Sequence, residues 1–264
     1  MEGCLRVSSC IVVAAALVAG CSSKVLVVVD PDPCADGGCF PPELFDGLVG
    51  YWRLDETEGT TAKDSSEGRN PGRLVGLNPA TAWVAGHAAG GLSVQAGGYV
   101  EVLPSASLDS ITTQVTVSGW GYLQGTVMDY ATIASREIGS TIDQHYHISI
   151  NTDETPTLFI ASDADMVRLT TPTPVTRSTW VHIAGTYDGT IARLYVNGQH
   201  VAAEPLAGPI KADTTPFILG GNGNGMSTPT ELFPGRIDEV MLYRRALTPV
   251  EIAQLHDGAL FQTR

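Results

Sequence analysis

The stretch Trp180-Val-His-Ile-Ala-Gly-Thr-Tyr-Asp-Gly-Thr-Ile-Ala-Arg-Leu-Tyr-Val-Asn-Gly198 decides the fold. It holds two runs rich in β-branched and aromatic residues, 180–187 and 191–196. They flank Asp188-Gly189, and Asp-Gly is a strong signal for a two-residue hairpin turn. Asn197-Gly198 is a second turn signal of the same kind. The stretch therefore predicts consecutive antiparallel strands joined by tight turns.

The same rhythm continues over most of the chain. Further strand-like runs, separated by Gly, Asn and Pro turns, lie at 48–54, 72–76, 91–95, 99–103, 114–122, 131–135, 146–150, 157–160, 216–219 and 235–243. In the run 114–122, alternation places Val115 and Val117 on one face and Thr116 and Ser118 on the other. More than ten strands without intervening helices predict an all-β sandwich or barrel.

One short helix is predicted near the C-terminus. Thr248 is a good N-cap, Pro249 fits the first helical position, and Glu251 can close a capping box. Ile252 and Leu255 share a face of this helix, so we expect both to pack inward.

Composition supports an all-β domain and limits its partners. The 264 residues include 29 glycines and 16 prolines, typical of many turns, and 43% are hydrophobic, enough for a core. The formal net charge is −13, and a chain this acidic repels phosphate backbones, so we expect no nucleic-acid partner. The excess of carboxylates is compatible with divalent cations, calcium above all.

The N-terminus predicts export and lipid anchoring. An apolar run of about ten residues ends in Val18-Ala-Gly-Cys21, which resembles the lipobox of bacterial lipoproteins. That resemblance implies a signal peptide over 1–20 and acylation of Cys21, which anchors the protein to a membrane. Ser22 favours the outer membrane in a cell that has two. The alternative is an ordinary secretory signal with an incidental cysteine.

Residues 21–45 are predicted to be a flexible tether. The segment 30–42 is too rich in proline, glycine and aspartate to enter a sheet. Cys34 and Cys39 lie close together in a protein predicted to be exported, so we expect one small disulfide loop. The domain proper is predicted to cover 46–264.

Several segments, in this order, resemble the laminin-G-like domain of the concanavalin A-like jelly-roll superfamily. They are Gly47-Leu-Val-Gly-Tyr-Trp-Arg-Leu-Asp-Glu56, Asp64-Ser-Ser66, Val117-Ser-Gly-Trp120, the stretch 180–189, Leu194-Tyr-Val-Asn-Gly198 and 235–252. The resemblance implies a two-sheet antiparallel jelly-roll sandwich of about six or seven strands per sheet, one sheet concave, with one short C-terminal helix. Such domains bind sugars, proteins or calcium, but the fold does not fix the ligand.

The resemblance also implies a structural calcium. Asp55, at the end of the first strand, and Asp238, in the last, are the matching positions, with backbone carbonyls completing an oxygen shell. The alternative is that Asp238 is a hydrogen-bonding carboxylate of the core and that Asp55 caps a turn.

Several side chains are candidates for ligand binding. Trp83 and Tyr130 lie where a flat ring can be exposed to stack on a sugar, although packing is the alternative role for both. His145 and His147 share one strand face, as a pair of metal ligands does, but no third ligand follows, so two groove or surface histidines are favoured. A glycine-rich loop carries Asn222 and Asn224, and loops of this kind often bind ligands.

These features favour a non-catalytic cell-surface module that binds a carbohydrate or a protein partner. Hydrolases of the superfamily carry paired carboxylates on alternating positions of one strand, and we find no such strand. We therefore expect no enzyme activity. The alternatives are a glycoside hydrolase-like enzyme with an unrecognised acid pair and a purely structural envelope lipoprotein.

Overall fold

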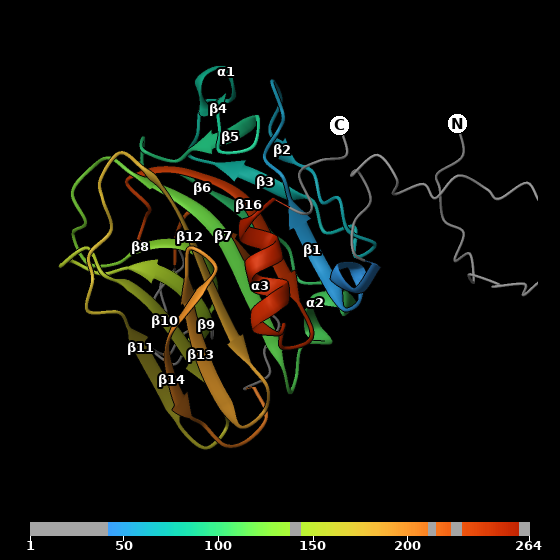
Figure 1. Ribbon diagram of the computed structural model, residues 1–264. Helices are drawn as coiled ribbons and strands as arrows, with labels where there is room; N and C mark the ends of the chain where they lie inside the picture. The colour runs from blue at the N-terminus through green and yellow to red at the C-terminus, as the bar shows by residue number, and fades with distance from the viewer. Residues whose placement is uncertain (1–41, 138–143, 211–214, 223–228, 259–264) are drawn as a thin grey trace, which may run out of the picture.

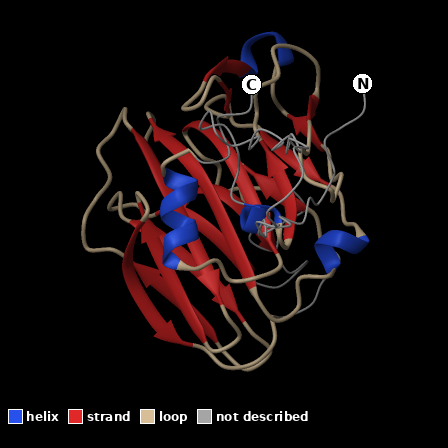
Figure 2. Ribbon diagram, turned by 45° about the vertical axis from the view of Figure 1, so that its right-hand side comes forward, coloured by secondary structure: helices blue, strands red, loops and turns tan. Residues whose placement is uncertain are grey.

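Two antiparallel β-sheets packed face to face make up most of the structure (Figures 1 and 2). It is a computed structural model, and it describes residues 42–137, 144–210, 215–222 and 229–258. Four residues with a predicted role lie outside these ranges: Cys21, Cys34, Cys39 and Asn224. The lipidation, the disulfide and the second loop asparagine therefore stay predictions.

Sheet A has the strand order β14-β13-β12-β7-β16-β5-β4, and β1 pairs with β16 beside this path. Its strands are β1 (Leu48–Trp52), β4 (Trp83–Ala85), β5 (Gly90–Ser93), β7 (Val115–Leu123), β12 (Trp180–Tyr187), β13 (Ile191–Val196), β14 (Gln199–Pro205) and β16 (Gly235–Tyr243). The predicted hairpin is present as β12–β13, with Ala184 opposite Tyr195, and β14 follows as expected.

Sheet B has the strand order β11-β10-β9-β8-β15-β6-β3-β2. Its strands are β2 (Thr61–Ala62), β3 (Gly72–Val75), β6 (Tyr99–Val102), β8 (Ala131–Glu137), β9 (Gln144–Ile150), β10 (Pro156–Ala161), β11 (Met166–Thr170) and β15 (Phe217–Leu219). Each sheet has eight strands in the described ranges, rather than the expected six or seven, because short strands such as β2 and β4 extend the edges.

The main core lies between the sheets and follows the predicted alternation. On β7, Val115 and Val117 are fully buried against sheet B. Gly119 lies on the same face, and a Cβ atom there would come within 2.9 Å of the Ile133 side chain. The glycine therefore allows the two sheets to approach closely.

In the described ranges, four short helices accompany the sheets: η1 (Pro42–Phe45), α1 (Pro79–Ala82), α2 (Ala106–Asp109) and α3 (Pro249–His256). The predicted C-terminal helix is α3, with its capping box between Thr248 and Glu251, and Ile252 and Leu255 are buried. Figure 1 shows α3 lying across the outer face of sheet A. Among the described residues, no helix is both long and apolar enough to cross a bilayer.

A second apolar cluster fills the space between sheet A and the helices η1 and α3. It contains Leu44, Tyr51, Ala184, Tyr195, Met241, Tyr243, Leu247, Ile252 and Leu255. Leu44 is fully buried, so the packed domain includes residues 42–45, which the sequence pattern placed in the tether.

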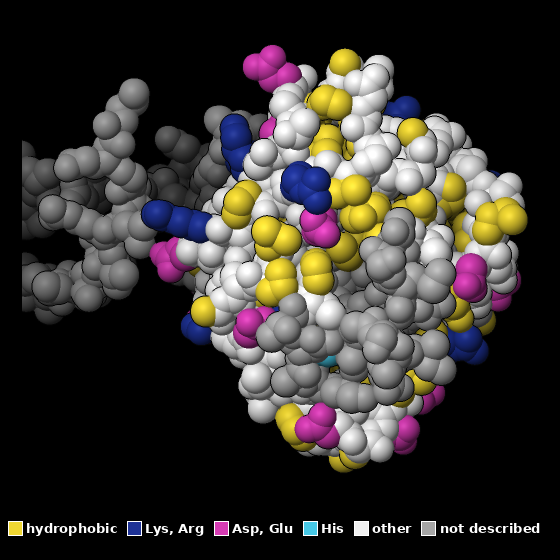
Figure 3. All heavy atoms as spheres, turned by 180° about the vertical axis from the view of Figure 1, so that it is seen from behind, with side chains coloured by type: hydrophobic (Ala, Val, Ile, Leu, Met, Phe, Trp, Pro, Cys, Tyr) yellow, Lys and Arg dark blue, Asp and Glu magenta, His cyan; other side chains and the backbone are white. Residues whose placement is uncertain are grey.

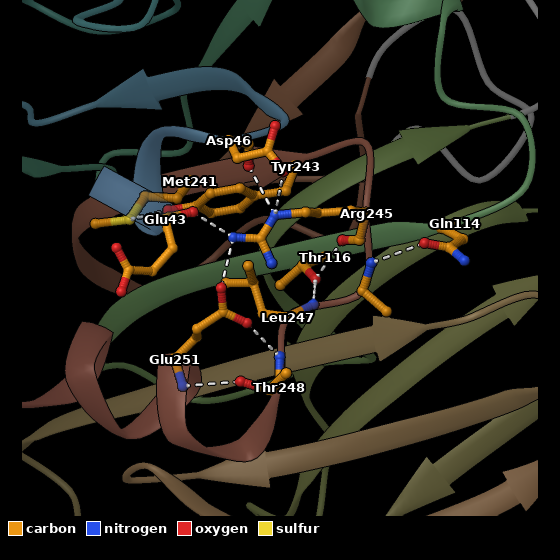
Figure 4. Close-up of polar contacts among 11 residues, drawn as sticks. Glu43, Asp46, Gln114, Thr116, Met241, Tyr243, Arg245, Leu247, Thr248 and Glu251 are labelled. Atoms are coloured by element: carbon orange, nitrogen blue, oxygen red, sulfur yellow. Dashed lines mark hydrogen bonds and ion pairs between the residues drawn. The ribbon is translucent and has the colours of Figure 1, made fainter. Parts of the chain in front are cut away.

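The Arg245 guanidinium joins the two helices (Figure 4). It donates to the carbonyls of Asp46 (2.7 Å) and Glu43 (2.6 Å) beside η1, and to Glu251 Oε1 (2.6 Å) on α3. Below it, Thr116 Oγ1 donates to the Arg245 carbonyl (2.7 Å) and accepts the Leu247 N–H (2.9 Å). These bonds therefore hold η1 and α3 against the outer face of sheet A.

Candidate functional site

Sheet B turns a polar face outward along β9. Alternation sends Tyr146 and Ile148 into the core and places His145, His147 and Ser149 on the outer face. The two histidines do share a face, as their spacing predicts. Neither lies on the surface, because His145 is 2% exposed and His147 is 0% exposed.

Four hydroxyl side chains on neighbouring strands form what we call the hydroxyl row. Thr132 on β8 lies opposite Ser149 on β9, Ser149 opposite Thr157 on β10, and Thr157 opposite Thr170 on β11. Three strand spacings of ~4.8 Å give the row a length of ~14 Å. The first three residues are fully buried, and Thr170 is partly exposed.

A parallel row lies one step along the strands and contains His147. Ser135 on β8 is opposite His147, which is opposite Phe159 on β10, and Phe159 is opposite Arg168 on β11. The exposure rises from buried Ser135 and His147, through half-buried Phe159, to exposed Arg168. This face therefore opens to solvent at the β10–β11 end.

Several buried polar atoms on this face lack a hydrogen-bond partner. In the part of the chain that the structure describes, Thr132 Oγ1, Ser149 Oγ, Asn222 Oδ1 and both ring nitrogens of His147 have none. We call these the open polar atoms. Burial lowers the pKa of His147 to about 3, so its ring is neutral at physiological pH. A buried polar atom without a partner is destabilising, and the described part of sheet A carries such atoms as well, on His182, Thr186 and Tyr195.

Asn222 reaches this face through the loop after β15. Ser135 Oγ donates to the Gly221 carbonyl (2.9 Å), which fixes the loop beside β8. The side-chain nitrogen of Asn222 donates to Glu231 Oε2 (2.7 Å), so only its oxygen is open. The structure therefore brings Asn222 to the same face as His147, which the sequence alone did not indicate.

Aromatic rings stand at the solvent-exposed end. The Phe159 ring centroid lies 4.3 Å from that of His147 and 5.5 Å from that of Tyr130. The Tyr130 hydroxyl accepts a bond from Arg168 Nη1 (3.0 Å). Tyr130, predicted as a ligand-binding residue, thus joins His145, His147 and Asn222 around one face. Figure 3 looks onto the side of the molecule opposite to α3, where charged and hydrophobic side chains are interspersed.

Trp83, the remaining described candidate, lies elsewhere. It belongs to β4 at the edge of sheet A, is half-buried, and donates from Nε1 to the Gly59 carbonyl (2.9 Å). It lines an open pocket of about 640 Å³ together with Asp55 and Glu56. Two residues predicted for different roles, Trp83 and Asp55, therefore share one hollow.

The two aspartates predicted for calcium hold the turn between β4 and β5. Asp238 Oδ2 accepts the backbone N–H groups of His87 (2.7 Å) and Ala88 (3.1 Å), and Asp55 Oδ1 accepts that of Gly90 (2.8 Å). Across the described ranges, no three or more His, Cys, Asp and Glu side chains are arranged to hold a metal ion. Calcium binding by Asp55, Asp238 and backbone carbonyls stays a prediction.

A pair of buried carboxyls lies where β16 bulges. Glu239 follows Asp238 with a left-handed backbone (φ 49°), and its Oε2 accepts the Tyr51 hydroxyl. Burial raises the pKa of Asp238 to about 7, and burial with the Asp238 charge raises that of Glu239 to about 8. Neither residue lines the pocket beside Trp83.

Sequence reasoning missed Thr132, Ser149 and Phe159. The alternation that placed His145 and His147 together also places Ser149 with them, so this residue could have been predicted from the sequence. Thr132 and Phe159 become neighbours of β9 only through strand register, which no local pattern in their own segments sets.

Comparison with known proteins agrees with this architecture. A model of the concanavalin A-like lectin/glucanases superfamily matches residues 94–253. Pappalysin-1 of Mus musculus is 32% identical over 133 residues, which are 47% of this chain and 8% of that protein. The chain therefore spans under a tenth of this curated relative.

Similar solved structures come from proteins of different kinds. Domain 4 of AbnA, a GH43 extracellular arabinanase from Geobacillus stearothermophilus solved with arabinotriose, is 19% identical with a TM-score of 0.62, covering 79% of this chain and 98% of that domain. The binding domain of Paraclostridial Mosquitocidal Protein 1 is 18% identical with a TM-score of 0.60, covering 81% of this chain and 52% of that one. A sialidase from Trypanosoma rangeli is 17% identical with a TM-score of 0.62, covering 90% of this chain and 37% of that one. At such identities the likeness shows the fold alone. The family match over 94–253 goes further, and the chain belongs to the concanavalin A-like lectin/glucanases superfamily.

Proposed function

We propose that this chain is a non-catalytic carbohydrate-binding module whose site is the outer face of sheet B. The observation that carries the proposal is the set of open polar atoms on Thr132, Ser149, His147 and Asn222. One of these residues, His147, lies beside the half-buried ring of Phe159. Hydroxyl, imidazole and amide groups next to an aromatic ring suit the hydroxyl groups and apolar faces of sugars.

The similar structures add support of a general kind. The arabinanase domain was solved with arabinotriose, and a binding domain of botulinum neurotoxin DC with SialylT. Both are statements about those proteins. They make carbohydrate the first class of ligand to test.

The direct test is a glycan array probed with the full chain in detergent, as wild type and as Thr132→Val and Ser149→Ala variants. We expect the wild type to bind, and each variant to bind about tenfold more weakly, since ~1.4 kcal/mol corresponds to a factor of ten. The matched control is Thr116→Val, the same change on sheet A, assayed where the protein remains folded. Equal binding by wild type and both sheet B variants would contradict the proposed site.

Catalysis is the competing function, and the raised pKa values of Asp238 and Glu239 make it testable. Any bound glycan should be incubated with the chain and assayed for new reducing ends. We expect none. If the wild type forms reducing ends and the Glu239→Gln variant does not, the protein is a hydrolase and the proposal of a non-catalytic module is wrong.

Anchoring and calcium complete the proposal. The module is placed at the cell envelope, in the outer membrane where there is one, through acylated Cys21. A Cys21→Ser variant should leave the membrane fraction and lose metabolically incorporated fatty acid. Repeating the array with a calcium chelator tests whether calcium contributes to glycan binding. Unchanged binding and unchanged thermal stability would contradict a role for calcium.

A further inference from the structure

We propose that the outer face of sheet A carries a second ligand site, which binds saccharides that bear a carboxylate. Its residues form what we call the aromatic row: Trp180 on β12, Tyr122 on β7 and Arg236 on β16. Strand register places the three side by side, with Tyr122 opposite both of the others. The inference goes beyond the proposed function, because it uses another face of the molecule and other residues.

The packing of α3 stops one step short of the aromatic row. The last residue of the helix, His256, reaches the Trp120 ring with centroids 5.4 Å apart, and the His182 ring at 5.9 Å. Trp120 and His182 are buried and form the preceding pair on the same face of β7 and β12. The three residues of the aromatic row are instead partly exposed, so a ligand can reach their side chains.

The two rings of the aromatic row supply an apolar surface. The ring centroids of Trp180 and Tyr122 lie 5.3 Å apart, and their planes are inclined by 56°. The His87 ring, from the turn between β4 and β5, meets Trp180 edge-on with centroids 6.1 Å apart. Aromatic faces that stay partly exposed can pack against the C–H faces of a pyranose ring, which favours a saccharide over a simple anion.

The polar atoms of these rings are available to a ligand. Among the hydrogen bonds of the described residues, none uses Trp180 Nε1 or the Tyr122 hydroxyl, whereas Trp83 donates from Nε1 to a backbone carbonyl. An indole N–H can only donate, and the Arg236 guanidinium has five N–H donors and no acceptor. The aromatic row is therefore rich in donors, which favours a ligand rich in acceptors.

Arg236 supplies the positive charge of the aromatic row. Its guanidinium carbon lies 5.3 Å from the Tyr122 ring centroid, and Nη1 makes one long bond to the Ala85 carbonyl (3.4 Å). In the part of the chain that the structure describes, no acidic side chain pairs with it, whereas Arg193 on the same sheet pairs with Asp188 (2.6 Å). A guanidinium packed on a ring is already oriented, so two of its N–H groups can bind a carboxylate together.

Two acidic side chains border this face, and both are bonded within the protein. Asp238 is buried and accepts the backbone N–H of His87 (2.7 Å), and Asp257 bonds the His256 ring (2.9 Å). The net charge of −13 opposes the approach of an anion at long range. At physiological ionic strength, charges more than ~8 Å away are largely screened, so the contact with Arg236 decides the preference.

The test is calorimetric titration of the full chain in detergent with matched sugar pairs: sialyllactose against lactose, and trigalacturonate against its fully methyl-esterified form. We expect the acidic member of at least one pair to bind at least fivefold more tightly. Arg236→Gln should remove this preference and keep the affinity for the neutral member within twofold. Trp180→Leu should weaken binding of the acidic member several-fold. The matched control is Arg168→Gln, the same change beside Phe159 on sheet B, which should keep the preference.

The outcomes separate this site from the one proposed on sheet B. A preference for the acidic member that survives Arg236→Gln, or that is lost in Arg168→Gln instead, overturns the inference, and circular dichroism checks that each variant is folded. Equal binding of both members, or no binding of either acidic sugar, also overturns it and leaves the sheet B proposal in place. Conversely, binding of acidic sugars alone that is unchanged in Thr132→Val supports the aromatic row and contradicts the site on sheet B.

Discussion

The two sheets bury the same kinds of polar side chain on their outer faces, and in three matched pairs the side chain of sheet A has at least one hydrogen-bond partner while that of sheet B has none in the described ranges. The matched residues are Thr116 and Thr132, Ser118 and Ser149, and His182 and His147. Thr116 bonds two backbone groups, and Ser118 Oγ lies 2.8 Å from His182 Nε2. The sheet B counterparts have no hydrogen-bond partner in the described ranges.

The difference indicates what each face is for. On sheet A, Thr116 bonds the segment that leads into α3 (Figure 4), and Ser118 bonds His182 on the neighbouring strand, so both hydroxyls belong to the folded protein itself. On sheet B, equally buried hydroxyls are destabilising until something else bonds them. Burial alone therefore does not distinguish a structural polar group from a ligand-binding one. The contrast between the sheets holds for the three matched pairs, since His182 Nδ1, Thr186 Oγ1 and Tyr195 Oη on sheet A also lack a hydrogen-bond partner in the described ranges.

The largest expected effect contrasts the two threonines. Thr116→Val should lower the free energy of unfolding by about 2–4 kcal/mol, because the Arg245 carbonyl and the Leu247 N–H lose their partner. Thr132→Val should leave stability within about 0.5 kcal/mol of wild type or raise it, since it removes an unbonded hydroxyl. Urea denaturation measures both. Equal destabilisation by the two changes would contradict the difference in role between Thr116 and Thr132.

The pH dependence of stability provides a further test of the comparison, on the sheet A side. A carboxyl group whose pKa rises on folding keeps a proton that the unfolded chain has released, so its contribution to stability falls as the pH rises from about 4 to about 8. Glu239→Gln keeps an acceptor for Tyr51 and removes one such group. The decline between pH 5 and 8 should then shrink by on the order of 1–3 kcal/mol.

The control for that measurement is Glu101→Gln, which removes a carboxylate paired with Arg73 at the surface. Its unfolding curve should keep the wild-type pH dependence. On the acid side, burial lowers the pKa of His147 and His182 to about 3, so stability falls as the pH drops from about 6.5 toward 3. An unchanged slope above pH 5 in Glu239→Gln would show that Glu239 ionises normally.

The serines give a smaller contrast. Ser118→Ala should lower the free energy of unfolding by about 1–2 kcal/mol, because His182 loses its hydrogen bond while buried. Ser149→Ala should change stability little and should weaken glycan binding instead. Thermal unfolding with and without a bound glycan separates the two: the stabilisation by ligand should shrink in Ser149→Ala and stay unchanged in Ser118→Ala.

The fold was predictable because its signals are local. The Asp188-Gly189 turn, the alternation along 114–122 and the Thr248 capping box each act within a few residues, and each is present in the structure. The site was predictable only in part. His145 and His147 follow from alternation within one strand, whereas the meeting of Thr132 with Ser149 depends on the pairing of β8 and β9.

The smallest expected effect concerns the aromatic residues, one beside each sheet. Trp83→Phe should lower stability by about 0.5–1.5 kcal/mol, because the bond from Nε1 to the Gly59 carbonyl is lost. If sheet B is the binding face, the glycan affinity of the Trp83→Phe variant should stay within twofold of wild type. Phe159→Leu keeps an apolar side chain at the exposed end of the face but removes the ring, and should weaken binding several-fold. The reverse result, with affinity lost in Trp83→Phe and kept in Phe159→Leu, would move the site to the pocket that Trp83 shares with Asp55. The open polar atoms of sheet B would then need a different explanation.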